Sequence, residues 1–239
     1  MALPAYATFS QRLWHYAYLA ICAVVLFFLV APLIVVIPLS FSKSPFLHFT
    51  PEFLRLDPEA FSLRWYRIMI GDCSAPDITT VCSDRWKDGA RNSLFIAIFA
   101  TFFATTLGTL ASLALSRVYT PFRRTLMAVM ISPLIVPLII TASGMFMFFA
   151  KFQLVATFTG MIIAHTVLGI PFVVITVTAT LISFDHNLTR AASGLGGTPF
   201  YNFFKIQVPL ITPGVVAGAL FAFITSFDEV VIVLFIGSQ

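Results

Sequence analysis

The sequence predicts an all-α membrane protein, a bundle of helices that cross a lipid bilayer. Hydrophobic residues make up 59% of the 239-residue chain, charged residues make up only 10%, and the mean hydropathy is +0.97. A soluble domain carries roughly 25% charged residues, and a single core could not hide so much apolar surface. Apolar runs recur at about the twenty-residue length that a helix needs to cross a bilayer. The net charge of +4 forms no basic stripe, which argues against a nucleic-acid partner.

Five apolar segments are long enough to be membrane spans. They cover residues 18–39, 92–115, 126–149, 155–182 and 214–236. The first segment is too long for the apolar part of a signal peptide, and Leu39-Ser40-Phe41 is a poor cleavage site, so we interpret it as a signal anchor. We therefore expect a single transmembrane domain over residues 1–239.

Basic residues in the connections predict how the spans are oriented. They gather before the first span, between the second and third spans, and in the segment 183–213 (Arg12, Arg117, Arg123, Arg124, Arg190 and Lys205). The turn between the third and fourth spans holds only Lys151, and the loop 43–91 holds equal numbers of basic and acidic residues. Cytoplasmic loops are rich in Lys and Arg, so the N-terminus and the segment 183–213 are expected in the cytoplasm. The loop 43–91 is expected outside.

Two cysteines, Cys73 and Cys82, lie in this expected outer loop. A compartment outside the cytoplasm is oxidising, so a disulfide between them is one interpretation and a pair of free thiols is the other. No His or third Cys is close to the pair in the sequence, which argues against a zinc site. We expect no metal site.

The segment 183–213 is polar, broken by glycines and rich in aromatic residues. It contains Arg190-Ala191-Ala192, then Gly194 and Gly196, and later Ile206-Gln207-Val208-Pro209. This spacing resembles the cytoplasmic coupling loop of ABC importer permeases, in which Glu-Ala-Ala is followed by Gly and later by Ile-x-Leu-Pro. Arg190 stands at the position of the Glu, and Val208 conservatively replaces the Leu.

Three other stretches extend the resemblance to permeases of the spermidine/putrescine type. Residues 61–66 read Phe-Ser-Leu-Arg-Trp-Tyr, residues 92–94 read Asn-Ser-Leu, and residues 226–231 contain the Phe-Asp-Glu that the family has after its coupling loop. The resemblance implies a helical bundle like that of type I ABC importer permeases. Such permeases usually finish with one more helix, so we expect a sixth span after Gln239.

Within the segment 183–213 we expect two short helices joined by a glycine turn. Asn187 or Thr189 is the expected N-cap of the first helix, Pro199 is expected in the first turn of the second, and Val208-Pro209 is expected to end it. Small alanines allow another surface to approach closely. Such a unit could dock as a rigid knob on an ATPase, and the alternative is an amphipathic hairpin lying on the inner leaflet.

Polar residues inside the spans are candidates for a solute pathway. Asp228 and Glu229 lie about fifteen residues beyond Pro213, roughly 22 Å along a helix and past the middle of the membrane. Acids at this depth are costly and usually functional, although a structural hydrogen bond is the alternative, and we favour Asp228 for the pathway. We interpret His165 as a helix–helix hydrogen bonder more readily than as a ligand. Thr141 and Ser143, which follow prolines in the third span, are further candidates.

No P-loop or other catalytic pattern occurs in the sequence, so we expect neither an enzyme nor a bound cofactor. The resemblance implies a permease of the bacterial inner membrane that, with a second and related permease chain, carries a polyamine, an amino-acid derivative or a similar small solute. A dimer of ATPase subunits would bind ATP and Mg, a periplasmic binding protein would deliver the solute, and lipid would surround the helices. The alternative is an ion-coupled secondary transporter, which predicts an internal repeat that we do not find.

Overall fold

The computed structural model describes residues 6, 8–44, 48–70, 85–117 and 119–237. Helices dominate this part of the chain, and its β-structure amounts to one isolated bridge between Ser42 and Phe61. The chain divides into two units, Met1–Asp88 and Gly89–Gln239, which are described separately below. The predicted all-α fold class is confirmed.

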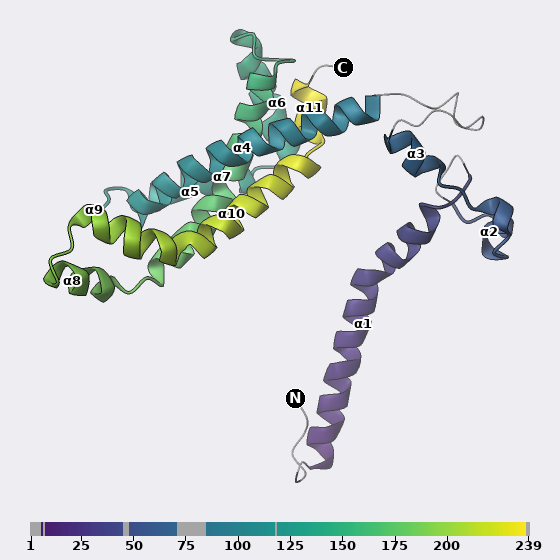
Figure 1. Ribbon diagram of the computed structural model, residues 1–239, viewed down its shortest axis with the longest axis horizontal. Helices are drawn as coiled ribbons and strands as arrows, with labels where there is room; N and C mark the ends of the chain where they lie inside the picture. Colours follow the sequence, from purple (N-terminus) through teal and green to yellow (C-terminus); the bar gives the residue numbers. More distant parts are fainter. Residues whose placement is uncertain (1–5, 7, 45–47, 71–84, 118, 238–239) are drawn as a thin grey trace. The chain divides into compact units, whose positions relative to one another are not determined.

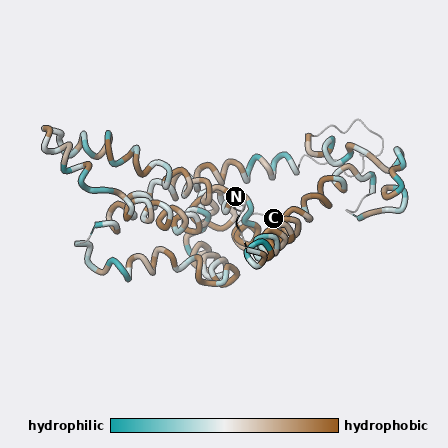
Figure 2. The backbone as a smooth tube through the Cα atoms, turned by 90° about the horizontal axis from the view of Figure 1, so that it is seen from below, coloured by the Kyte–Doolittle hydropathy of each residue, from teal (hydrophilic) through white to brown (hydrophobic). Residues whose placement is uncertain are grey.

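Helix α1 (Phe9–Leu39) is the longest element of the first unit. It begins with a capping box, in which the Gln11 N–H donates to Thr8 Oγ1 and the Thr8 N–H donates to Gln11 Oε1. From Tyr16 onward its residues are apolar, and within α1 only Leu39 is buried. Figure 2 colours the backbone by the hydropathy of each residue. A helix of this composition needs a bilayer or a packing partner, as expected of a first membrane span.

Three short helices follow α1 in the first unit: α2 (Pro51–Leu54), η1 (Pro58–Ala60) and α3 (Arg64–Ile70). Thr50 caps α2 through a bond from the Phe53 N–H, and Phe53 itself is buried against the Phe61 ring, with the two ring centroids 4.7 Å apart. Cys73 and Cys82 lie outside the described residues. Their disulfide therefore stays a prediction.

The second unit is a bundle built around one buried helix, α7 (Phe158–Ile182). Helices α4 (Arg85–Leu115), α5 (Arg123–Ile135) and α10 (Val208–Asp228) pack against α7 (Figure 1). Helices α6 (Leu138–Lys151) and α11 (Val231–Ile236) pack against each other (Figure 1). The elements α8 (His186–Gly194), α9 (Pro199–Asn202) and the π-helical η2 (Phe203–Gln207) connect α7 to α10.

Small residues allow α4, α7 and α10 to approach one another closely. A Cβ placed on Gly169 of α7 would lie 3.0 Å from Ala104 Cβ of α4 and 3.1 Å from Ala222 Cβ of α10. On α10, the buried residues Gly214, Gly218, Ala222 and Ser226 recur every four positions and form one stripe that faces α7. Helices in membranes associate through close packing of this kind, because lipid gives them no hydrophobic drive to associate.

Adding one methyl group to this stripe is expected to destabilise the bundle. A Cβ on Gly218 would lie 2.9 Å from Val173 Cα and 2.5 Å from Thr176 Oγ1, and the backbone atom cannot move without shifting α7. We expect Gly218→Ala to lower the free energy of unfolding by about 1–3 kcal/mol, measured by denaturation of the detergent-solubilised protein. Gly144→Ala is the matched control, since a Cβ there meets no atom within 4 Å. Equal stability of the two variants would contradict the packing argument.

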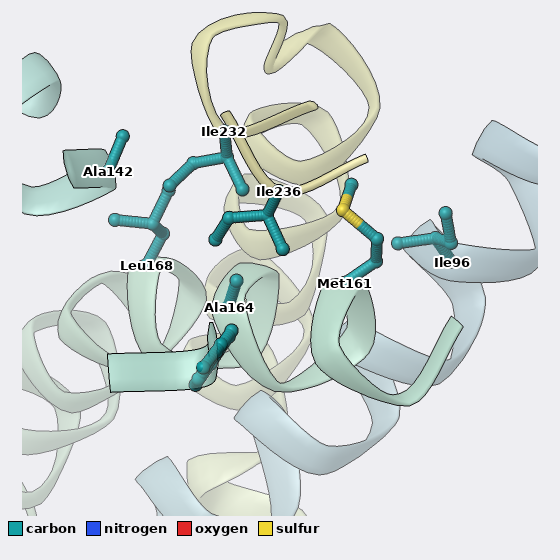
Figure 3. Close-up of a cluster of buried hydrophobic side chains, with 8 residues drawn as sticks. Ile96, Ala142, Met161, Ala164, Leu168, Ile232 and Ile236 are labelled. Atoms are coloured by element: carbon teal, nitrogen blue, oxygen red, sulfur yellow. The ribbon is translucent and has the colours of Figure 1, made fainter. Parts of the chain in front are cut away.

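A second buried cluster joins α4, α6, α7 and α11. Its members are Ile96, Ala142, Phe149, Met161, Ala164, Leu168, Ile232 and Ile236. Figure 3 shows Ile232 and Ile236 pointing from α11 toward the α7 residues Met161 and Leu168. The Ala156 N–H also donates to the Ile236 carbonyl at 2.8 Å, which attaches the end of α11 to the turn before α7. The short helix α11 is thus held by its apolar side chains and its backbone.

Two of the predicted spans are interrupted in the structure. The third, residues 126–149, is divided into α5 and α6, which are bent by 103°. Pro137 disfavours the helical conformation for Val136, which is extended with ψ of 132°. The fifth, residues 214–236, is divided at Glu229, which is also extended, with ψ of 112°. The structure also begins α10 earlier than predicted, at Val208.

Candidate functional site

We call residues 183–213 the coupling hairpin, and it begins with a capped helix. The Asn187 N–H donates to Asp185 Oδ1 at 2.9 Å, so Asp185 is the N-cap of α8. The predicted caps, Asn187 and Thr189, are wrong, because both residues lie inside the helix. The Thr189 hydroxyl instead donates to the His186 carbonyl at 2.8 Å. Asp185, two residues before Asn187, was the signal available in the sequence, because aspartate is a favoured N-cap residue.

The reversal after α8 depends on glycine. Gly196 has φ of +91°, a left-handed conformation that L side chains rarely adopt. Around it, the Leu195 N–H donates to the Ala191 carbonyl at 3.1 Å, and the Gly197 N–H donates to the Ala192 carbonyl at 2.9 Å. These bonds satisfy carbonyls that the end of a helix otherwise leaves without partners. Gly194, by contrast, is the last residue of α8.

Asn202 connects the two arms of the coupling hairpin. Its side chain is 5% exposed, and Nδ2 donates to Ser193 Oγ at 2.8 Å and more weakly, at 3.4 Å, to the Thr189 carbonyl. A Cβ on Gly197 would lie 2.5 Å from Asn202 Oδ1, so the turn fits closely over this amide. The sequence pattern did not single out Asn202. Its one signal was a polar residue within a run of aromatic ones.

The second arm of the coupling hairpin continues into the membrane helix. Helices α9 and α10 are joined through η2, so that helical structure runs without a break from Pro199 to Asp228. The prediction that Val208-Pro209 ends the second helix is wrong. Proline lacks an N–H and clashes with the carbonyl four residues earlier, and the π turn Phe203–Gln207 directly before it widens the backbone at that point. A displacement of the hairpin therefore has a continuous helical path into α10.

The outer surface of the coupling hairpin is apolar and exposed. Leu195 is 90% exposed and Phe200 is 77% exposed, and both lie at the end of the second unit where α8 and α9 meet (Figure 1). A hollow of about 460 Å³ lies beside Leu195 and is lined by Ala192, Leu195, Gly196, Gly197, Thr198 and Tyr201. Arg190 and Ala191 are exposed, Ile206 is half-buried and Pro209 is exposed. The structure places the predicted coupling residues on α8, on the glycine turn, on η2 and at the start of α10.

The two adjacent acids of the candidate pathway have different surroundings. Glu229 Oε1 accepts the Val231 N–H at 2.7 Å and the Ile232 N–H at 3.1 Å, so this carboxylate caps α11. Asp228 is the last residue of α10 and is exposed, and the structure gives it no hydrogen bond or ion pair within the described residues. A structural hydrogen bond, the alternative to a role in the pathway, therefore fits Glu229. Asp228 stays the better candidate for contact with a solute.

His165 lies inside the bundle and is 2% exposed. Its Nδ1 lies 3.0 Å from Ser226 Oγ of α10, and this contact favours the interpretation of a helix–helix hydrogen bond. Thr141 and Ser143 lie near the start of α6, where the Ser143 hydroxyl donates to the Ile140 carbonyl of its own helix at 3.0 Å. No hydrogen bond joins either residue to Asp228 among the described side chains. Their place in a pathway stays a prediction.

Residues 104–239 match the family of binding-protein-dependent transport system inner membrane components. The chain belongs to this family. It is 28% identical over 209 residues to the spermidine/putrescine transport system permease protein PotC of Escherichia coli K12, covering 87% of this chain and 72% of that protein. It is 30% identical over 217 residues to the putrescine transport system permease protein PotI of the same strain, covering 87% and 70% respectively.

A solved structure shows the same fold. The crystal structure of a bacterial ABC transporter involved in the import of the acidic polysaccharide alginate matches with a TM-score of 0.64 and 16% sequence identity, covering 93% of this chain and 74% of that one. Together with the family, this likeness confirms the permease fold inferred from the coupling-loop pattern. The chain is a multi-pass inner-membrane permease subunit and not an enzyme, and ATP hydrolysis belongs to a separate subunit. This family membership excludes the ion-coupled secondary transporter.

Proposed function

We propose that this chain forms, with a second and related permease subunit, the route by which polyamines cross the bacterial inner membrane. The observation that carries this proposal is the similarity over 87% of the chain to two permeases whose names specify spermidine and putrescine. Polyamines are small organic cations. A route for them needs groups that replace part of their hydration without holding them tightly.

Asp228 supports a cationic solute. It is an exposed carboxylate at the end of a largely apolar helix, and no described basic residue pairs with it. An unpaired acid in a membrane span is costly unless it faces water or a cation. A single carboxylate of this kind attracts a cation more weakly than a closed cage of ligands would, which suits release of the solute. The adjacent Glu229 carboxylate already accepts two backbone N–H groups, so it attracts a cationic solute less strongly.

The coupling hairpin is the proposed docking surface for a dimer of ATPase subunits, which would bind ATP and Mg themselves. Its apolar tip, its internal bonds through Asn202 and its continuous connection to α10 support this role. Under this proposal the hairpin and the N-terminus lie in the cytoplasm, as the distribution of basic residues predicts. A periplasmic binding protein would then deliver the solute to the opposite face.

Uptake measurements test the proposed solute. In cells without other polyamine importers, production of this chain with the remaining subunits of its transporter is expected to give energy-dependent uptake of radiolabelled spermidine or putrescine. Omission of this chain alone is expected to abolish that uptake. Excess unlabelled polyamine should compete with the label, whereas a neutral sugar should not. Transport of a neutral or anionic solute without any transport of polyamine would overturn the proposal.

A further inference from the structure

A hollow lies where the end of α4 meets the coupling hairpin (Figure 1). Its volume is about 550 Å³, within the range of about 300–1,000 Å³ that small-molecule sites occupy. One wall comes from the end of α4 and the residues after it, and the other comes from the hairpin. The lining residues are Leu113, Ser116, Arg117 and Tyr119 on the first wall and His186, Phe203 and Gln207 on the second.

The hollow lies at the ends of three helices of the bundle. Helix α4 ends at Leu115, two residues before Arg117, and α5 begins at Arg123. On the other wall, Gln207 directly precedes Val208, the first residue of α10. The polar headgroup region of a bilayer begins where the apolar part of a membrane helix ends. The hollow is therefore level with the lipid headgroups.

The polar groups of the hollow suit a phosphate. Arg117 brings a guanidinium to one wall and Gln207 an amide to the other, and within the described part of the chain neither side chain has a hydrogen bond or ion pair. No described acid lines the hollow, and the sequence has none between Asp88 and Asp185. Asp185 itself accepts the Asn187 N–H as the cap of α8. A guanidinium binds phosphate through two parallel hydrogen bonds, so the hollow favours an anion of this kind.

Apolar side chains accompany these polar groups. Leu113 and Phe203 are half-buried and give each wall an apolar surface. Tyr119 is 96% exposed, and Phe122 in the same turn is 81% exposed. Tyrosine is enriched at membrane interfaces, where its ring lies among the headgroups, and basic pockets between membrane helices bind anionic headgroups. The combination fits a lipid better than a soluble anion.

We propose that this hollow binds one anionic phospholipid, with its phosphate between Arg117 and Gln207. The guanidinium and the amide donate to the phosphate oxygens, and the acyl chains extend along Leu113 and Phe203 into the bilayer. The bound lipid connects the end of α4 to the second arm of the coupling hairpin. This site goes beyond the proposed transport role, because it does not depend on which solute the transporter carries.

A carboxylate of a docked ATPase subunit is the competing occupant. Arg117 also borders a second hollow, of about 590 Å³, which reaches Phe200 near the tip of the hairpin. A carboxylate would pair with the guanidinium but would leave the rings of Tyr119 and Phe122 without a role. A lipid accounts for the guanidinium, for the apolar walls and for these exposed rings together. The observations therefore favour the lipid.

Lipid titration tests the site in the assembled transporter. The complex is purified in detergent and stripped of lipid, and its affinity for phosphatidylglycerol is measured by native mass spectrometry. We expect Arg117→Gln and Gln207→Glu each to weaken the tightest site at least about fivefold, because one removes a positive charge and the other adds a negative charge. Arg124→Gln is the matched control, since Arg124 is exposed at the start of α5 and does not line the hollow. It is expected to bind like the native chain.

Each other outcome overturns the lipid site. If both variants of the hollow bind phosphatidylglycerol like the native chain, the hollow does not hold the headgroup. If Arg124→Gln weakens binding as much as they do, the attraction belongs to the surface charge in general. If inorganic phosphate displaces the lipid, the site takes a free anion. If Arg117→Gln leaves lipid binding unchanged but weakens binding of the ATPase subunit in nanodiscs of phosphatidylcholine alone, the occupant is a protein carboxylate.

Discussion

Replacing Gly196 with tryptophan is expected to lower solute transport at least about tenfold while the chain still inserts into the membrane. Gly196 lies at the tip of the coupling hairpin, and no atom lies within 4 Å of its Cβ position. Under the proposed docking role, an indole there would project into the space assigned to the ATPase and would keep the two surfaces apart. Transport and ATP hydrolysis are measured in proteoliposomes, together with the amount of permease and ATPase in the purified complex.

Gly196→Ala is the control that separates bulk from backbone strain. Both variants force an L residue into φ of +91°, at about 1–2 kcal/mol, but only tryptophan adds a large side chain. We expect the alanine variant to keep most of its transport. Normal transport by the tryptophan variant would contradict a docking role for this turn. An equal loss in both variants would assign the effect to the backbone of the hairpin.

Composition and spacing predicted the class of the protein well. Long apolar runs identify the membrane helices because a bilayer requires about twenty apolar residues per helix, whatever the tertiary packing. The pattern from Arg190 to Pro209 identified the family because it combines small residues, a glycine turn and a proline at set distances. These features are local in the sequence. Local features can be read without a structure.

Other features depend on contacts between distant residues, and the sequence did not reveal them. Asn202 bonds to Ser193 and Thr189 only because α8 and α9 lie side by side. The division of the fifth span carries no Pro or Gly signal, since the Glu229 side chain itself caps the new helix. Pro209 gave a misleading signal. A proline normally ends or kinks a helix, but the π turn before it allows helical structure to continue.

Replacing Asp228 and Glu229 separately is expected to distinguish an effect on transport from an effect on structure. Asp228→Asn removes the charge but keeps the size of the side chain, and we expect uptake of a polyamine to fall about tenfold at low concentration. That fall corresponds to about 1.4 kcal/mol, close to the lower end of the range for a hydrogen bond to a charged group. Because Asp228 has no partner among the described residues, the yield of the complex should stay unchanged. Uptake and complex yield are measured on the same preparations.

Glu229 is expected to respond in the opposite way. Glu229→Gln keeps an oxygen that can accept the N–H groups of Val231 and Ile232, so both yield and uptake should stay near normal. Glu229→Ala removes that acceptor, which costs about 0.5–2 kcal/mol for a helix cap and loosens α11, so the yield of the complex should fall. Normal uptake by Asp228→Asn would show that the Asp228 carboxylate is not part of the solute pathway. A loss of uptake by Glu229→Gln at normal yield would instead show that the charge of Glu229, and not only its capping oxygen, acts on the solute.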